Sequence, residues 1–175
     1  MIETNYSFME SHRTQGGVHR HEDAKVVTAP PLMWVKAVDI VLGRLRAAGI
    51  DFNQVRAISG SGQQHGSVYW KKGARNVLNS LHSGEPLCQQ LDSCFATNES
   101  PVWMDSSTAA ECRELEEAVG GKKELAVITG SRGYERFTGS QILKIKRKLP
   151  QVYDETERIS PVSYTHLTLP TTPYV

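Results

Sequence analysis

Apolar side chains recur at helical spacing in three parts of the chain, and each repeat predicts a helix. Between Pro31 and Gly49 they stand three or four positions apart, which predicts an amphipathic helix over 31–48 packed on a sheet. Proline is favoured in the first turn of a helix and glycine just after its end, so both boundaries agree with this interpretation. Two shorter repeats, after Thr108 and around Ile145, predict further helices in the second half of the chain.

The repeat after Thr108 carries a signal for the start of a helix. Thr108 followed by Glu111 fits a capping box, in which the two side chains bond free backbone N–H groups of the first turn. The predicted buried face consists of Ala109, Cys112, Leu115 and Val119. A short helix over 124–128 follows. We interpret the basic run at 144–148 as a solvated helix face with its cations pointing outward, not as a nucleic-acid patch.

The segment 55–70 predicts a strand, a turn and a second strand, with apolar runs at 55–58 and 68–70. The polar stretch between them holds three glycines, which let a backbone approach a ligand closely. It also holds Gln63, Gln64 and His65, whose side chains both donate and accept hydrogen bonds. Without a Lys or Arg, this stretch suits a polyhydroxylated ligand better than an anion. The alternative is a strand corner whose polar groups only bond the backbone.

Neither common phosphate-binding loop is present. Gly60, Gly62 and Gly66 give the pattern G-x-G-x-x-x-G, which is one residue longer than the dinucleotide-binding fingerprint and leads into a strand instead of a helix. The P-loop pattern G-x-x-x-x-G-K-[ST] occurs nowhere in the chain. The sequence therefore gives no support to a nucleotide-binding loop of either kind.

Two regions show little or no periodicity. The first, 71–100, is polar and predicts a surface excursion with short helical turns at its leucines. The second, 161–175, is dense in Thr and Pro and has neither a helical nor a strand period. We therefore expect a folded part over 1–160, which forms a partial domain, and a disordered or foreign tail over 161–175.

Composition narrows the class of protein. Hydrophobic residues make up 39% and charged residues 22%, as in a folded globular domain, and the net charge is +1. So small a net charge gives no strong electrostatic attraction to nucleic acid or to a membrane surface. No apolar run is long enough to span a membrane, and the first residues do not resemble a secretory signal.

Three cysteines predict free thiols and a cytoplasmic location. His12, His19 and His21 cluster, but no clear Cys or carboxylate set joins them, so we expect surface histidines and no metal site.

Five short stretches, in order along the chain, resemble the FGGY carbohydrate kinases. They read RTQGGVH at 13–19, SGQQHGSVYW at 61–70, PVWMDSST at 101–108, AVGG at 118–121 and TGSRGYERFTGSQI at 129–142. One such match would be weak. Five in the same order, across roughly 6–160, agree with one another and carry the resemblance.

The resemblance implies an α/β fold of the actin-like, ribonuclease-H-like type, with a mixed sheet and flanking helices. The implied activity is that of the eukaryotic xylulokinase branch, in which ATP with Mg²⁺ phosphorylates D-xylulose on its 5-hydroxyl. The family's catalytic aspartate and nucleotide-binding segments lie outside the matched stretches. We therefore expect the complete enzyme to use ATP and Mg²⁺, and this chain alone to bind neither and to be inactive.

The same resemblance implies which residues meet the sugar. His65 and Arg136 match the family's sugar-contacting histidine and arginine, and Gln64 stands in the same motif as His65. Trp103 and Asp105 match the family's Trp-x-Asp segment beside the sugar site. A planar guanidinium can bridge two adjacent oxygens. From the residues alone, Arg136 could instead pair with a nearby carboxylate such as Asp105, and Trp103 could be core. No residue of this chain is assigned as the catalytic base.

A second hypothesis is a non-catalytic sugar-binding or interaction protein derived from half a kinase domain. It predicts the same contacts from His65 and Arg136, so the site residues do not separate it from the kinase hypothesis. Within the kinase family, glycerol, gluconate and ribulose are alternative substrates, although the QQHG and WMDSS forms favour xylulose.

Overall fold

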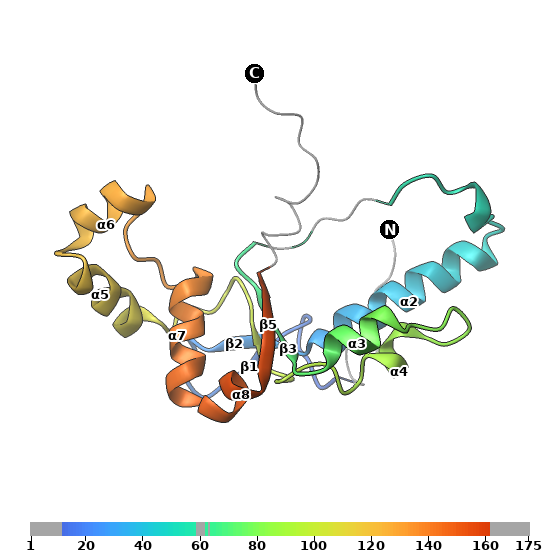
Figure 1. The fold of residues 1–175 in the computed structure, drawn as a ribbon, viewed down its shortest axis with the longest axis horizontal. Helices are drawn as coiled ribbons and strands as arrows, with labels where there is room; N and C mark the ends of the chain where they lie inside the picture. Colours follow the sequence, from blue (N-terminus) through green and yellow to red (C-terminus); the bar gives the residue numbers. More distant parts are fainter. Residues whose placement is uncertain (1–11, 59–61, 63, 162–175) are drawn as a thin grey trace, which may run out of the picture.

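The computed structural model describes residues 12–58, 62 and 64–161, and its strands form two small antiparallel sheets (Figure 1). The first sheet has the order β1-β2-β4, formed by His19–Arg20, Val27–Ala29 and Ser100–Pro101. The second pairs β3, Ser67–Lys71, with β5, Thr156–Pro161. With helices around both sheets, the architecture is mixed α/β, as the sequence predicted.

Strand β3 has a partner on each of its edges. Its whole length pairs with β5 on one side. On the other side Trp70 forms a bridge with Phe95, and the Tyr69 carbonyl accepts a 2.9 Å hydrogen bond from the Ala96 N–H. The side chain of Tyr69 is fully buried. β3 is therefore held along its whole length by β5 and, at Trp70, by Phe95 on the other edge.

The predicted strand at 55–58 is not formed. These residues have no regular secondary structure, and Val55 and Ile58 are 41% and 85% exposed. The second arm of the predicted pair, 68–70, does lie in β3. The β3 edge opposite β5 is bridged to Phe95 at Trp70, so this part of the edge is not free to pair with 55–58.

Helix α2, Pro31–Ala47, forms where the apolar period predicted it, but only its first half packs on the core. Met33 joins one buried cluster, with Val18, Val27, Ala29 and Val102. Leu32 and Val35 pack against the other, formed by Ala74, Leu91, Cys94 and Phe95. Further along, Val38 and Leu45 are 48% and 40% exposed, so the prediction that the whole stripe is buried is wrong.

The excursion predicted over 71–100 contains two short helices, α3 at Ala74–Asn79 and α4 at Leu87–Gln90. A single 3-10 turn, Phe52–Gln54, lies before β3. The carboxylate of Asp39 on α2 accepts hydrogen bonds of 2.9 and 2.8 Å from the N–H groups of Leu87 and Cys88. These bonds satisfy the free donors of the first turn of α4 and fasten it to α2.

The second half of the chain is helical, and α5 and α6 project to one side of the molecule (Figure 1). The four helices are α5 at Ala109–Ala118, α6 at Lys122–Thr129, α7 at Thr138–Lys148 and α8 at Pro150–Glu155. The prediction of a capping box at the start of α5 is wrong. The Thr108 hydroxyl donates a hydrogen bond to the Glu135 carbonyl and makes no bond to the N–H groups of the first turn. Leu115 is also exposed, unlike the buried Cys112 one turn earlier.

The predictions for the two ends of the chain fall outside the described residues, which stop at Pro161. That residue pairs with Ser67 in the β3–β5 ladder.

All three cysteines are free, as predicted. In the part of the chain that the structure describes, no helix combines the length and apolar character needed to cross a membrane.

Candidate functional site

His65 lies in the turn that leads into β3, with a backbone φ of 69°. A positive φ is uncommon outside glycine, although His is one of the types that adopt it more often. The turn places the imidazole 5.4 Å from the ring centroid of Phe137 and 6.3 Å from that of Tyr134. Gln64, the preceding residue, is exposed. Both predicted side chains of this turn therefore lie where a ligand could reach them.

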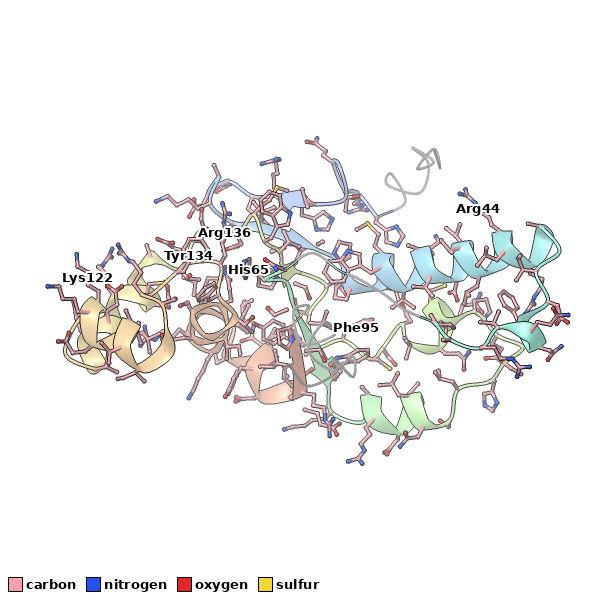
Figure 2. All side chains as sticks on the ribbon, turned by 90° about the horizontal axis from the view of Figure 1, so that it is seen from above. Arg44, His65, Phe95, Lys122, Tyr134 and Arg136 are labelled. Carbon is pink, nitrogen blue, oxygen red and sulfur yellow. The ribbon has the colours of Figure 1, made fainter. Side chains whose placement is uncertain are left out.

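Arg136 belongs to the loop between α6 and α7, and its guanidinium lies against two aromatic rings. The guanidinium carbon is 5.4 Å from the ring centroid of Trp103 and 5.8 Å from that of Tyr134, within the range of cation–π contacts. Because Tyr134 also contacts His65, one ring links the imidazole to the guanidinium (Figure 2). The structure thus brings together His65, Trp103 and Arg136 from three separate motifs.

The aromatic rings of this cluster are only partly covered. Trp103, Tyr134 and Phe137 remain 39%, 39% and 40% exposed. Apolar surface beside a few well-placed donors is typical of small-molecule sites. Tyr134 and Phe137 were not among the residues predicted from the sequence. Their position next to Arg136 in the segment YERF was the available signal.

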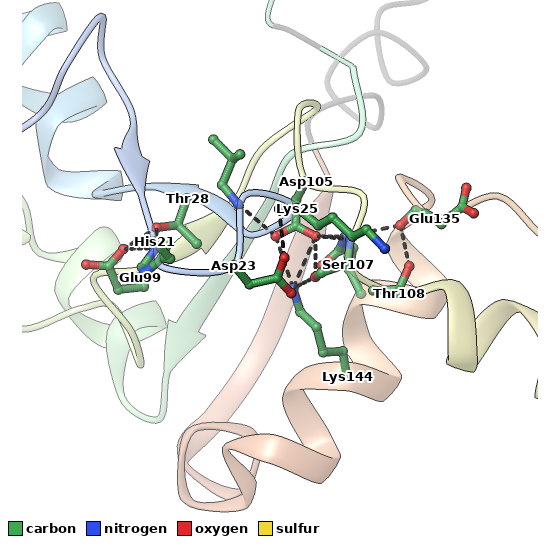
Figure 3. Close-up of polar contacts among 12 residues, drawn as sticks. His21, Asp23, Lys25, Thr28, Glu99, Asp105, Ser107, Thr108, Glu135 and Lys144 are labelled. Carbon is green, nitrogen blue, oxygen red and sulfur yellow. Dashed lines mark hydrogen bonds and ion pairs between the residues drawn. The ribbon is translucent and has the colours of Figure 1, made fainter.

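Asp105 lies apart from this open surface and is fully buried. Its oxygens accept hydrogen bonds from Val27 N–H, from the N–H and hydroxyl of Ser107, from Gln141 Nε2 and from Lys144 Nζ, at 2.7–3.2 Å (Figure 3). Burial alone would raise the pKa of this carboxyl, but Gln141, Ser107 and Lys144 hold it below its usual value. Among the described residues no hydrogen bond joins Arg136 to Asp105, so the alternative of an Arg136–Asp105 pair is not formed. The predicted contact between Asp105 and the sugar stays a prediction.

Lys144 corrects the interpretation of the basic run 144–148. Its side chain is 8% exposed and its ammonium lies 3.1 Å from Asp105 Oδ2 and 2.8 Å from Ser107 Oγ. The other cations of the run, Lys146, Arg147 and Lys148, are exposed as predicted. One turn of α7 therefore presents a buried ammonium to a buried carboxylate. Removing either group would leave the other charge without its partner in a low-dielectric interior.

Gly133 allows the arginine loop to approach α5. A Cβ atom at this position would stand 3.0 Å from the Cys112 carbonyl oxygen and 3.1 Å from Cys112 Cβ. The Gly133 N–H also donates a 3.0 Å hydrogen bond to Glu116 on the same helix. A side chain at 133 would push the loop that carries Arg136 away from its support.

Replacing Gly133 with alanine should therefore lower the free energy of unfolding by about 1–3 kcal/mol, because backbone atoms of α5 cannot move aside cheaply. Urea unfolding followed by circular dichroism measures the loss. The matched control is Gly139→Ala in the first turn of α7, where a Cβ would meet nothing within 4 Å and alanine favours the helix. Equal stability of the two variants would show that the close approach at Gly133 is unimportant.

A separate polar cluster fastens β1 to the segment before β4. Glu99 lies 2.9 Å from His19 Nδ1 and 3.7 Å from His21 Nε2, and it accepts a hydrogen bond from the Thr28 hydroxyl. The other ring nitrogen of His19 lies 2.9 Å from the His12 carbonyl oxygen. The sequence showed no clear carboxylate set beside these histidines, whereas the fold supplies Glu99, 80 positions after His19, from the end of the excursion just before β4.

Two acceptors around the His19 ring favour its doubly protonated form. Burial lowers the pKa of His19, but the His12 carbonyl and the Glu99 carboxylate outweigh it and raise the pKa above 6.5. The stabilisation is therefore complete below about pH 6.5 and is lost as the pH rises through the raised folded-state value. We expect the urea midpoint of the wild type to fall more between pH 6 and 8 than that of His19→Gln. Parallel pH profiles would contradict this.

Comparison with known proteins gives close similarity to one group of enzymes. No protein-family model matches the chain. It is 59% identical over 150 residues to xylulose kinase of Mus musculus, which covers 86% of this chain and 27% of that protein. It is 52% identical over 158 residues to xylulose kinase 2 of Arabidopsis thaliana, with coverage of 90% and 28%. The chain spans about a quarter of the length of these relatives.

The fold agrees with this similarity. A crystal structure of a sugar kinase from Brucella ovis, described as a xyloylose kinase, superposes with a TM-score of 0.62 at 18% identity, covering 86% of this chain and 26% of that one. At this identity the match shows the shared fold alone. The identities to xylulose kinases confirm the resemblance predicted from the five motifs, and the structural match shows that the chain corresponds to part of the sugar-kinase fold.

Proposed function

We propose that this chain, a homologue of the xylulose kinases over most of its length, forms part of the sugar site of an enzyme that phosphorylates D-xylulose with ATP. The observation that carries the proposal is the meeting of His65 and Arg136 around the ring of Tyr134. Their motifs lie far apart in the sequence, and the family resemblance assigns both residues to the sugar. The identities of 50–59% to xylulose kinases support D-xylulose as the substrate.

In this proposal the chain binds and orients the sugar. The guanidinium of Arg136 donates hydrogen bonds to two neighbouring oxygens, and its stacking on Trp103 limits its motion. The imidazole of His65 bonds a hydroxyl or the ketone oxygen, and Gln64 closes the turn beside it. Trp103 offers its exposed face to the carbon atoms of the sugar. Holding the 5-hydroxyl in a fixed direction is the contribution that such residues make to phosphoryl transfer.

The described residues fit a neutral sugar and not MgATP. The carboxylate of Asp105 is enclosed by its donors, and the turn at 64–66 carries no cation for a phosphate. We therefore propose that ATP, Mg²⁺ and the catalytic base are held by parts of the complete enzyme that this chain does not span. When bound there, MgATP supplies the phosphoryl group. The free thiols support a cytoplasmic location as part of the same proposal.

A chimaeric enzyme tests the proposal. Residues 6–160 replace the matching segment of the mouse xylulose kinase, which is similar enough to accept them. ADP release is measured with D-xylulose, D-ribulose, glycerol and gluconate. We expect D-xylulose to be the preferred substrate, with kcat/KM within about tenfold of the parent, since a tenfold change is only about 1.4 kcal/mol. A folded chimaera that prefers another substrate, or that binds D-xylulose without turnover, would overturn the proposal.

A further inference from the structure

The buried Asp105 network reaches the arginine loop through one backbone carbonyl. Gln141 Nε2 donates to Asp105 Oδ1 at 2.8 Å and also to the carbonyl oxygen of Glu135 at 3.1 Å. The same carbonyl accepts a 2.5 Å hydrogen bond from the Thr108 hydroxyl. This carbonyl belongs to the peptide that joins Glu135 to Arg136, so the two donors fix the plane from which the Arg136 side chain starts (Figure 3).

The orientation of the Gln141 amide follows from its neighbours. Both groups that it faces, the Asp105 carboxylate and the Glu135 carbonyl, are acceptors, so the nitrogen must point at them. Its oxygen, Oε1, is buried and has no hydrogen-bond partner among the described residues. An amide that leaves one buried atom without a hydrogen bond lowers the stability of the fold. Its contribution to the fold is the bridge between Asp105 and the arginine loop.

The second support of Arg136 also begins at Asp105. Trp103, whose ring lies under the guanidinium, stands two positions before Asp105 in the chain. The Asp105 N–H donates a 2.9 Å hydrogen bond to the Val102 carbonyl, which closes a tight turn around Trp103. The carboxylate then holds that turn against β2 through the Val27 N–H, at 3.1 Å. Both the loop behind Arg136 and the ring beneath it are therefore fastened to one buried side chain.

We propose that Asp105 is a positioning residue that sets the direction of the Arg136 guanidinium toward the sugar, through Gln141 on one side and the Trp103 turn on the other. It does so without touching the ligand, because it is fully buried and each of its oxygens is already bonded. The part of this inference that concerns the sugar rests on the proposed function. The part that concerns the placement of Arg136 does not.

Nuclear magnetic resonance on the 175-residue chain tests the placement directly. The rings of Trp103 and Tyr134 should shift the Arg136 side-chain resonances upfield and give cross-peaks to them. We expect Asp105→Asn and Gln141→Met each to remove these cross-peaks and return the shifts to random-coil values. The matched control is Glu114→Gln, which breaks the exposed Glu114–Arg147 pair and should leave them unchanged. Cross-peaks that persist in folded Gln141→Met would overturn the inference, even where Asp105→Asn fails to fold.

The kinetic consequence is measured in the chimaera. A misdirected Arg136 should raise the KM for D-xylulose about tenfold while kcat stays within about threefold. Thr108→Val, which removes the second bond to the Glu135 carbonyl, should act in the same direction, and Thr108→Ser, which keeps a hydroxyl, should restore KM. Leu91→Ala, in the other buried cluster, controls for lost stability. An equal rise of KM in Leu91→Ala would show a general structural effect, whereas an inactive parental chimaera would refute the proposed function and leave the resonance result standing.

Discussion

Replacing Lys144 with methionine is expected to lower the free energy of unfolding by about 3–5 kcal/mol, a large share of the stability of an ordinary domain. The substitution leaves the Asp105 carboxylate buried without its counter-charge, while the hydrogen bonds from Ser107 and Gln141 remain. Methionine fills most of the space of the lysine stem, so packing is nearly conserved. Urea unfolding at neutral pH, followed by circular dichroism, measures the loss.

Two further variants separate charge from packing. Lys148→Met, on the exposed part of the same helix, should change the stability by less than about 0.5 kcal/mol. The double variant Asp105→Asn with Lys144→Met should recover part of the loss, because no unpaired charge is left inside. If Lys144→Met and Lys148→Met lose the same stability, the ion pair contributes nothing beyond a surface contact.

The second large effect is expected in the proposed sugar site of the chimaera. His65→Ala and Arg136→Ala should each lower kcat/KM for D-xylulose at least tenfold, since one hydrogen bond to a charged group contributes about 1.5–3 kcal/mol. Arg136→Lys should restore little, because an ammonium neither bridges two oxygens nor stacks on Trp103 as a guanidinium does. ADP release at varied D-xylulose concentration gives the constants.

The matched control is Arg132→Ala in the same loop. Arg132 is 69% exposed on its side chain and pairs with Glu116 at 3.6 Å, away from the aromatic cluster. We expect its kinetics to equal those of the unmodified chimaera. Wild-type kinetics in either His65→Ala or Arg136→Ala would refute the assignment of that residue to the sugar.

Local patterns predicted the helices well and their environments less well. The 3.6-residue period placed α2 correctly, because proline and glycine mark its ends. The same period indicates that Lys144 is buried, although the basic composition of 144–148 suggested an exposed face. Gln141, Lys144 and Ile145 stand three and four positions apart and are all buried, so they share the inner face of α7. A charged residue on that face requires a buried partner, which directs attention to Asp105.

Other features depend on contacts that no local pattern contains. The 55–58 segment has strand-like composition, yet a strand also needs a pairing partner, and β3 pairs instead with β5 and, at Trp70, with Phe95. The Thr108 hydroxyl had a local partner in the capping box but bonds the distant Glu135 carbonyl instead. The motifs predicted that His65 and Arg136 share one site, whereas the rings that join them depend on how the loop before α7 folds against the turn that carries His65.

The pairing of β3 with β5 also sets when the site can exist during synthesis. Ser67 pairs with Pro161, so the strand that follows His65 waits for its partner until nearly the last described residue has left the ribosome. Helix α2 needs only its own residues and can form early, but closing so long a loop is entropically costly and slow. Until that moment the strand behind the turn carrying His65 lacks its pairing with β5. A ribosome paused before β5 would therefore hold a chain with helices but without the complete proposed sugar site.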